Sequence, residues 1–285
     1  MMPYQYQEGY FRSFDQTELF YRVYLNRDDD ADLMLVLHGL GEHSGRYAEY
    51  PVALENERLS FAMFDYRGHG RSRGTKFYVD SFRDYLKDVS AFHQFLGIQY
   101  REAESPVVYG HSVGALVAVH WAAINPHKSR ALFLSSPCFE LLTRKIVLDI
   151  NYCVNKIMPK YEYRNPVVTR YLSHDPKEVE NYEKDPLIER KISARLAEEL
   201  YKACQALDKE IAQKLEIPVF MMLAGDDRIV NSQKSVRFYQ WLRGPQKAIQ
   251  VFPDFYHEVF HEERKEEAFK CFKQFIRNYR DKGEV

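Results

Sequence analysis

The stretch PVVYGHSVGALVAVH, residues 106–120, joins two apolar runs through Gly110-His111-Ser112-Val113-Gly114. The first run, PVVY, has the length and β-branched content of a buried strand, and the second, over residues 113–124, has the length of a helix. A lone serine between two glycines at such a junction is either a turn residue or a nucleophile held on a strained strand-to-helix elbow. The rest of the chain decides between these two interpretations.

Short apolar runs like PVVY recur along the chain, separated by segments of helix length. The predicted strands of this kind cover residues 32–37, 60–64, 106–109, 131–134, 218–223 and 248–252. The predicted helices cover residues 47–57, 82–96, 113–124, 232–242 and 262–279. Two further strands, over residues 9–14 and 18–25, form a predicted edge hairpin. Because strands alternate with helices, the chain is predicted to be an α/β protein with a mostly parallel sheet flanked by helices.

One interval breaks this alternation. No strand-like run is found from residue 138 to residue 215, and Pro159, Pro166, Pro176 and Pro186 divide the interval into short segments. We therefore predict a helical insertion over residues 138–215, placed in a core formed by residues 1–137 and 216–285.

Apolar residues at the start of this insertion recur at helical spacing. They are Phe139, Leu141, Leu142, Ile146, Val147, Leu148, Ile150, Val154, Ile157 and Met158. We favour packing of this face against the sheet domain. The alternative, which is compatible with the first, is that part of the face lines an acyl-chain tunnel or touches a membrane or micelle surface.

Charge and cysteine content narrow the class of protein. Forty basic side chains against 41 acidic ones leave no excess charge for nucleic acid or for a polybasic membrane anchor. The cysteines at 138, 153, 204 and 271 are scattered, which favours free, buried thiols in a reducing compartment. The start MMPYQYQEGYF lacks the features of a signal peptide, so we expect a cytoplasmic protein that contacts membranes at most peripherally.

Groups that would activate Ser112 follow two later strands. A serine nucleophile needs a base within hydrogen-bond reach and an acid that orients the base. Asp226 and Asp227 follow the strand over 218–223, and His257 follows the strand over 248–252. Since the carboxyl ends of parallel strands meet at one edge of a sheet, these groups are expected to gather beside Ser112. The two aspartates compete for the role of acid, and we favour Asp227.

Backbone amides are predicted to complete the site. The N-terminus of the helix after Ser112 supplies the N–H of Val113, and the HGLG segment after the first parallel strand supplies the N–H of Leu40. His111 is expected to be structural. The glycine-bearing loop over residues 67–72 is expected to support the site, with no catalytic role for His69.

Two other function classes have to be weighed. Residues 257–261 read HEVFH, the motif with which a zinc hydrolase binds its metal through two histidines on one helix. Pro253 and Asp254 lie just upstream, however, and predict that His257 lies in a loop. The third class is a non-catalytic binding protein on a hydrolase fold, but such a chain would usually have lost one of the three catalytic side chains.

The motifs together resemble the monoglyceride lipase and lysophospholipase branch of the α/β-hydrolases, a grouping that includes serine aminopeptidases. They are HGLGEHSGRY (38–47), FDYRGHGRS (64–72), GHSVG (110–114), AGDDRIV (224–230), FYHEVFHE (255–262) and, in the insertion, SHDPKEVENYEKDPLI (173–188). The resemblance covers nearly the whole chain and implies an eight-stranded sheet with a helical cap inserted after the sixth strand.

Carried over residue by residue, the resemblance makes Ser112 the nucleophile, Asp227 the acid and His257 the base, with Leu40 and Val113 as oxyanion donors. It implies hydrolysis of monoacyl lipid esters without a cofactor or metal. The alternative on the same fold is a serine peptidase or a general carboxylesterase.

The resemblance also suggests roles for Glu42 and Arg46. They would support the oxyanion loop or bind the polar head of an ester, and the simpler alternative is a surface ion pair of little consequence.

Overall fold

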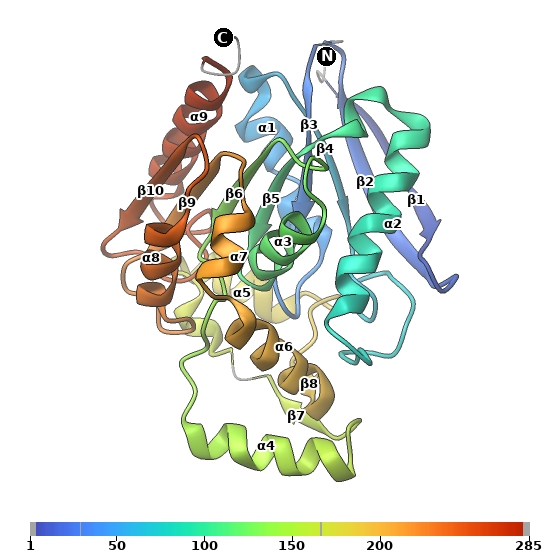
Figure 1. Ribbon diagram of the computed structural model, residues 1–285, viewed down its shortest axis with the longest axis vertical. Coiled ribbons are helices and arrows are strands. Elements are labelled where there is room, and N and C mark those ends of the chain that lie inside the picture. The colour runs from blue at the N-terminus through green and yellow to red at the C-terminus, as the bar shows by residue number, and fades with distance from the viewer. Residues whose placement is uncertain (1–3, 29, 166, 282–285) are drawn as a thin grey trace.

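One eight-stranded sheet forms the centre of the computed structural model, which describes residues 4–28, 30–165 and 167–281 (Figure 1). Its order is β1-β2-β4-β3-β5-β6-β9-β10, with β1, β2 and β4 paired antiparallel and all other neighbours parallel. The strands are β1 (Tyr4–Arg12), β2 (Glu18–Asn26), β3 (Asp32–Leu37), β4 (Leu59–Phe64), β5 (Val107–His111), β6 (Ala131–Ser135), β9 (Val219–Ala224) and β10 (Lys247–Phe252). The predicted α/β fold with a mostly parallel sheet is confirmed.

The continuous apolar runs are explained by burial on both faces of the sheet. In β3, Leu33, Leu35 and Leu37 point into one core, whereas Met34 and Val36 point into the core on the opposite face. Side chains alternate between faces along a strand, so a strand covered on both sides needs apolar residues at every position. The edge strand β10 departs from this pattern because only one neighbour covers it, and Val251 there is exposed.

Helices cover both faces, as Figure 1 shows. The helices on the first face are α2 (Arg83–Gln99), α3 (Val113–Ile124) and α8 (Ser232–Trp241), and those on the second are α1 (Tyr50–Ala53) and α9 (Lys265–Asp281). The sheet with a helical layer on each side places the carboxyl ends of the parallel strands at one edge, where a site can form.

The predicted helix over residues 47–57 is wrong in its extent. The segment contains the four-residue α1 between two 3₁₀ turns, Ser44–Tyr47 and Glu55–Glu57. Pro51 has no backbone N–H, so it cannot donate a helical hydrogen bond to the preceding turn. Arg58 adopts a left-handed conformation at φ +48° that ends the segment.

The predicted insertion lies between β6 and β9, which are neighbours in the sheet. Its elements are α4 (Lys145–Ile157), β7 (Glu162–Arg164), α5 (Pro176–Lys184), β8 (Lys191–Ser193), α6 (Ala194–Ala206) and α7 (Lys209–Lys214), with a 3₁₀ turn at Thr169–Tyr171. The expectation that it contains no strand is wrong, because β7 and β8 pair antiparallel in a separate two-stranded sheet. Strands of three residues are too short to show alternation in the sequence.

Helix α4 presents its apolar face outward, so the prediction that this face packs on the sheet domain is wrong. Six of the ten apolar residues named above are exposed, namely Leu142, Ile146, Val147, Ile150, Ile157 and Met158. The buried side chains of α4 are instead Asn151, whose Nδ2 donates to the Ala194 carbonyl over 3.2 Å, and Asn155. Cys153 on this helix is exposed, although all four cysteines are free thiols as expected. Figure 1 shows α4 at the end of the molecule farthest from both termini.

Candidate active site

Ser112 stands alone between the end of β5 and the start of α3. Its backbone has φ +51° and ψ −116°, a region that residues other than glycine rarely adopt. The neighbouring strand and the following loop hold this conformation: the Ser112 N–H donates to the Ser135 carbonyl over 2.9 Å, and its carbonyl accepts from the Cys138 N–H over 3.0 Å. A strained, well-held serine at the carboxyl end of a central strand fits a nucleophile elbow better than a turn serine.

The two glycines beside Ser112 are required by close packing. A Cβ atom at Gly114 would lie 2.1 Å from the Leu37 carbonyl oxygen, and one at Gly110 would lie 2.6 Å from the Gly114 carbonyl oxygen. Neither approach is sterically allowed, so α3 can lie this close to β3 and β5 only with glycine at both positions.

Three side chains from three strand ends converge at Ser112. His257 Nε2 lies 2.9 Å from Ser112 Oγ, and His257 Nδ1 lies 2.7 Å from Asp227 Oδ2. The other carboxylate oxygen of Asp227 accepts from the N–H groups of Ile229 and Val230, over 2.9 and 3.0 Å. The Ser112–His257 and His257–Asp227 distances are both those of good hydrogen bonds, and all three side chains are buried.

The charges of Asp227 and His257 stabilise each other. Burial lowers the pKa of His257, but the Asp227 charge and hydrogen bond outweigh burial, so that the pKa lies above the usual 6.5. Burial raises the pKa of Asp227, but the charge and hydrogen bond of His257 and the two backbone N–H groups outweigh it, so that the pKa is lowered. The pair therefore favours a state in which the imidazole has gained a proton, which is the state that a general base reaches.

The other polar residues considered in the sequence lie outside the hydrogen-bonded series from Ser112 through His257 to Asp227. Asp226 is on the surface in an ion pair with Arg228, and it does not contact His257. The His111 ring lies beside that of His257, 5.0 Å between centroids, where burial and His257 lower the pKa of His111 to about 4. His69 is buried, and burial with the neighbouring His38 lowers its pKa to about 3, so both His69 and His111 are neutral at pH 7.

The backbone N–H groups of Leu40 and Val113 are available to a ligand. Both residues line the cavity at Ser112, and neither N–H donates to another residue in the described part of the chain. The loop that carries Leu40 is fixed by Glu42, whose Oε1 accepts from the Gly39 N–H over 2.5 Å and from the Tyr47 hydroxyl over 2.6 Å. Two fixed, unused donors beside a serine hydroxyl can hold an oxyanion.

Arg46 lies in a buried ion-pair network, not on the surface. Its guanidinium bonds Glu42 Oε2 over 2.9 Å and both carboxylate oxygens of Glu258 over 2.6 and 2.8 Å. Burial raises the pKa of Glu42, but Arg46 outweighs it and the pKa falls to about 2. Glu258, next to His257, is thus tied through Arg46 to the loop that carries Leu40. No local pattern predicts a pair between residues 212 positions apart, and in the sequence Glu258 belongs to no other motif than HEVFH.

The HEVFH segment does not form the zinc-binding helix that the motif describes. It precedes α9, which begins at Lys265, so His257 lies in a loop as predicted. The His257 nitrogens face Ser112 and Asp227, whereas His261 Nδ1 lies 3.1 Å from Glu258. Within residues 4–28, 30–165 and 167–281, no group of three or more His, Cys, Asp or Glu side chains is arranged to share a metal ion.

The cavity beside Ser112 is small and is covered by the insertion. Its volume is about 30 Å³, far below the roughly 300–1,000 Å³ of a typical small-molecule pocket. The insertion contributes five lining residues, namely Cys138, Leu141, Val167, Leu172 and Tyr182. The insertion also holds the histidine loop, because the carbonyls of Tyr171 and Leu172 accept from the N–H groups of His257 and Glu258 over 3.3 and 2.8 Å.

Comparison with known proteins agrees with this geometry. Residues 29–264 match the model of the family described as serine aminopeptidase, S33. The chain is 32% identical to the uncharacterized protein YnbC of Escherichia coli over 97% of its own length, although it spans only 48% of that protein. It is 27% identical to the phospholipase YtpA of Bacillus subtilis, over 88% of this chain and 97% of that protein.

A solved structure shows the same architecture. The monoacylglycerol lipase of Paleococcus ferrophilus superimposes with a TM-score of 0.80 at 25% identity, over 96% of this chain and 99% of that one. The family match covers well over half of the chain, and the mostly parallel eight-stranded sheet with flanking helices is that of an α/β-hydrolase. The chain therefore belongs to the serine aminopeptidase, S33 family of α/β-hydrolases.

Proposed function

We propose that this chain is a serine hydrolase that cleaves carboxylic esters of monoacyl lipids, such as monoacylglycerols or lysophospholipids. Ser112 would be the nucleophile and His257 the general base. Asp227 would orient the His257 ring and stabilise its protonated form. The observation that carries the proposal is the continuous hydrogen-bonded chain from Ser112 Oγ through His257 to Asp227 on a strained elbow. This arrangement has the geometry that activates a serine hydroxyl.

The first half of the reaction forms an acyl-enzyme. His257 Nε2 takes the proton from Ser112 Oγ as that oxygen attacks the ester carbonyl carbon. The N–H groups of Leu40 and Val113 hold the negative oxygen of the tetrahedral intermediate, an effect worth roughly 3–4 kcal/mol per donor. His257 then gives its proton to the departing alcohol, and the acyl group stays on Ser112.

The second half releases the acid and restores the enzyme. Water gives a proton to His257 and attacks the acyl carbonyl, and the same two N–H groups hold the second oxyanion. The carboxylic acid leaves as Ser112 regains its proton from His257. Asp227 stays ionised throughout and stabilises the imidazolium, in keeping with its lowered pKa. No step needs a cofactor.

The names of the relatives support a lipid ester as substrate. One is a phospholipase and one a monoacylglycerol lipase, and each aligns with more than 85% of this chain. We propose that residues 138–215 act as a cap over the active site, which the insertion's share of the cavity lining supports. Because the cavity at Ser112 is far smaller than a typical ligand pocket, we expect the cap to move when an ester enters.

Matched esters and amides test the reaction class. We expect the enzyme to hydrolyse p-nitrophenyl octanoate and 1-monooctanoylglycerol, with kcat/KM at least a hundredfold above that for aminoacyl p-nitroanilides. The amides are the relevant alternative because the family description names an aminopeptidase and the same triad attacks amides. Faster turnover of an aminoacyl p-nitroanilide than of either ester would favour a peptidase, and turnover of none would favour a binding protein.

The outward face of α4 supports a transient contact with a membrane or micelle surface. Ile146, Ile150 and Ile157 recur at helical spacing and are 61%, 54% and 81% exposed. The exposed cations Lys145 and Lys156 lie on the same helix, where they would favour an anionic lipid surface. In the described part of the chain, no helix has both the length and the apolar character needed to cross a bilayer. Free cysteines support our further proposal of a reducing, cytoplasmic location.

Two charged substitutions on α4 test this contact. The double variant Ile146→Glu, Ile150→Glu is expected to bind phosphatidylcholine–phosphatidylglycerol vesicles about 10–100 times more weakly. The reason is that binding no longer transfers two apolar side chains from water into the lipid. Co-sedimentation with vesicles measures this change. The matched control is Ile98→Glu, Ile124→Glu, which alters two exposed isoleucines, 80% and 63% accessible, on α2 and α3. Equal losses in the two variants, or none in either, would contradict a lipid contact at α4.

A further inference from the structure

A second cavity of about 380 Å³ adjoins the site at Ser112. The two cavities share the lining residues Val167 and Tyr182, so the larger space lies directly beside the one at Ser112. The wall of the larger cavity is attached to the oxyanion loop, because the Glu189 N–H donates to the Gly41 carbonyl over 3.0 Å. The second cavity is thus placed where one end of an ester bound at Ser112 would extend.

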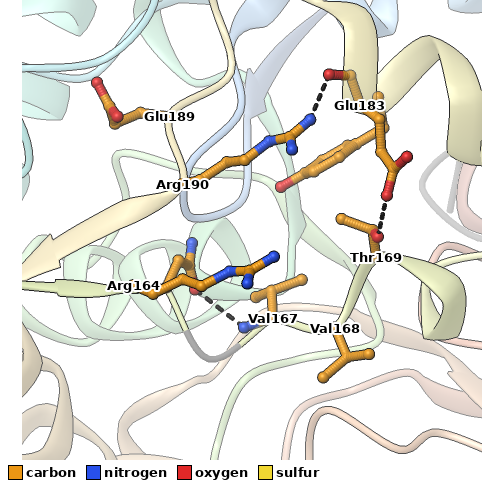
Figure 2. Close-up of a pocket in the computed structure, with 9 residues that line it drawn as sticks. Arg164, Val167, Val168, Thr169, Glu183, Glu189 and Arg190 are labelled. Atoms are coloured by element: carbon orange, nitrogen blue, oxygen red, sulfur yellow. Dashed lines mark hydrogen bonds between the residues drawn. The ribbon is translucent and has the colours of Figure 1, made fainter.

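Two guanidinium groups enter this cavity from adjacent strands of the insertion. Arg164 is the last residue of β7 and Arg190 directly precedes β8. The Asn165 N–H donates to the Arg190 carbonyl over 2.6 Å, which continues the strand pairing and keeps the two arginines close. Figure 2 shows both side chains extending into the cavity, with Arg190 held by a hydrogen bond to the backbone carbonyl of Glu183.

These two arginines have no direct carboxylate partner in the part of the chain that the structure describes. Among the described residues neither Arg164 nor Arg190 forms an ion pair, whereas the next residue, Lys191, pairs with Glu162 over 2.8 Å. Two carboxylates also line the cavity, but neither forms an ion pair with Arg164 or Arg190. The Glu183 carboxylate accepts from the Thr169 hydroxyl over 2.5 Å, and Figure 2 shows the Glu189 carboxylate pointing away from both guanidinium groups.

We propose that Arg164 and Arg190 bind an anionic group on the alcohol side of the ester, a phosphate or a carboxylate. The proposal rests on ester hydrolysis at Ser112 and narrows its substrate class to esters whose leaving alcohol is negatively charged. Guanidinium forks match the oxygens of both anions, and two of them on adjacent strands can hold one anion together. With the acyl carbonyl at Ser112, the leaving alcohol passes Val167 and Tyr182 and brings its charge to the two arginines.

Three esters with the same octanoyl chain test the assignment. They are 1-monooctanoylglycerol, which is neutral, 1-octanoyl-lysophosphatidylglycerol, which carries a phosphate, and O-octanoyl lactate, which carries a carboxylate. All three esters are used below the concentrations at which they aggregate, so that binding of the enzyme to a lipid surface does not affect the measured rates. Wild type is expected to show a kcat/KM at least tenfold higher for one or both anionic esters than for the neutral one. A preference for the phosphate ester alone identifies a lysophospholipid headgroup, and a preference for both identifies a general anion site.

Substitutions of the arginines should remove this preference. Arg164→Gln and Arg190→Gln are each expected to lower the ratio of anionic to neutral kcat/KM about tenfold, mainly through KM, as befits one charged hydrogen bond in a partly open site. Lys191→Gln removes the same charge at the adjacent position and should leave the ratio unchanged. Arg164 donates no hydrogen bond to another described side chain, so Arg164→Gln keeps the test informative even if Arg190→Gln unfolds.

The failure of this proposal is distinct from the failure of ester hydrolysis. Turnover of none of the three esters by wild type would refute the reaction at Ser112. Turnover of the neutral ester with no gain for either anionic ester, or an anionic preference that survives both arginine substitutions, would refute the anion site alone.

Discussion

Replacing Ser112 with alanine is expected to lower kcat for p-nitrophenyl octanoate by a factor on the order of 10⁵–10⁶, the loss seen when a serine nucleophile is removed from a triad. Without Oγ no acyl-enzyme can form, and His257 has no hydroxyl within its 2.9 Å reach. Steady-state kinetics at pH 8 measures the effect. The N–H groups of Leu40 and Val113 remain, so a trace of water-driven hydrolysis should persist.

Ser105→Ala is the matched control for this variant. Ser105 lies at the opposite end of β5 from Ser112, and its loss should leave kcat within a factor of about two, as expected for a substitution away from the site. An S112A enzyme that retains more than about a hundredth of wild-type kcat, with a normal melting temperature, would show that another group is the nucleophile.

Asp227→Asn is expected to lower kcat/KM about 10⁴-fold and to move its pH dependence. Wild-type kcat/KM should fall as the pH drops through the pKa of His257, because the protonated ring cannot accept the Ser112 proton. That inflection is expected above pH 6.5, since the Asp227 charge outweighs the effect of burial on the pKa of His257. In the variant the Asp227 charge is gone, and burial is opposed only by the smaller effects of Glu258 and Glu42, so the inflection should move to lower pH. Rate profiles from pH 5 to 9 measure both effects.

Asp226→Asn provides the comparison within the same loop. The Asp226 carboxylate pairs with the surface residue Arg228, so its loss should change kcat/KM less than about threefold, in keeping with the small worth of exposed ion pairs. Asp227 would not be the partner that sets the pKa of His257 in either of two cases. In the first, Asp226→Asn lowers kcat/KM more than Asp227→Asn does. In the second, neither variant shifts the low-pH inflection of kcat/KM.

The sheet and the elbow could be predicted from the sequence because both depend on local patterns. A strand buried on two faces must be apolar throughout, and β3, β5 and β9 show such runs within about two residues of their observed bounds. The glycines at 110 and 114 follow from the elbow, where no Cβ fits. The meeting of Ser112, Asp227 and His257 follows from a general rule of parallel sheets, which places the ends of parallel strands at one edge.

The insertion was predicted less well because its structure depends on contacts between distant residues. β7 and β8 are three residues long and pair across more than 25 positions, too short and too distant for a periodic signal. In α4 the helical spacing of apolar residues was clear, but spacing does not say which face meets the protein. There Asn151 is buried with its amide bonded to Ala194, while Ile157 is 81% exposed.

Two polar arrangements could not be predicted from the sequence for the same reason. Arg46 bridges Glu42 and Glu258, and the second of these lies more than 200 residues away. Arg164 and Arg190 share a cavity only because β7 and β8 pair. Long-range ion pairs and shared cavities carry no local pattern, and they also lie in the parts of the molecule where substrate preference is expected to be set.

Covalent labelling with a fluorophosphonate is the most direct test of the central claim that Ser112 is an activated nucleophile. Such a probe reacts with a serine oxygen that a neighbouring base has activated, and mass spectrometry of peptides locates the adduct. We predict one adduct per native chain, on Ser112, and none on heat-denatured protein or on S112A. An adduct at another residue, or no adduct on the native protein, would contradict the claim.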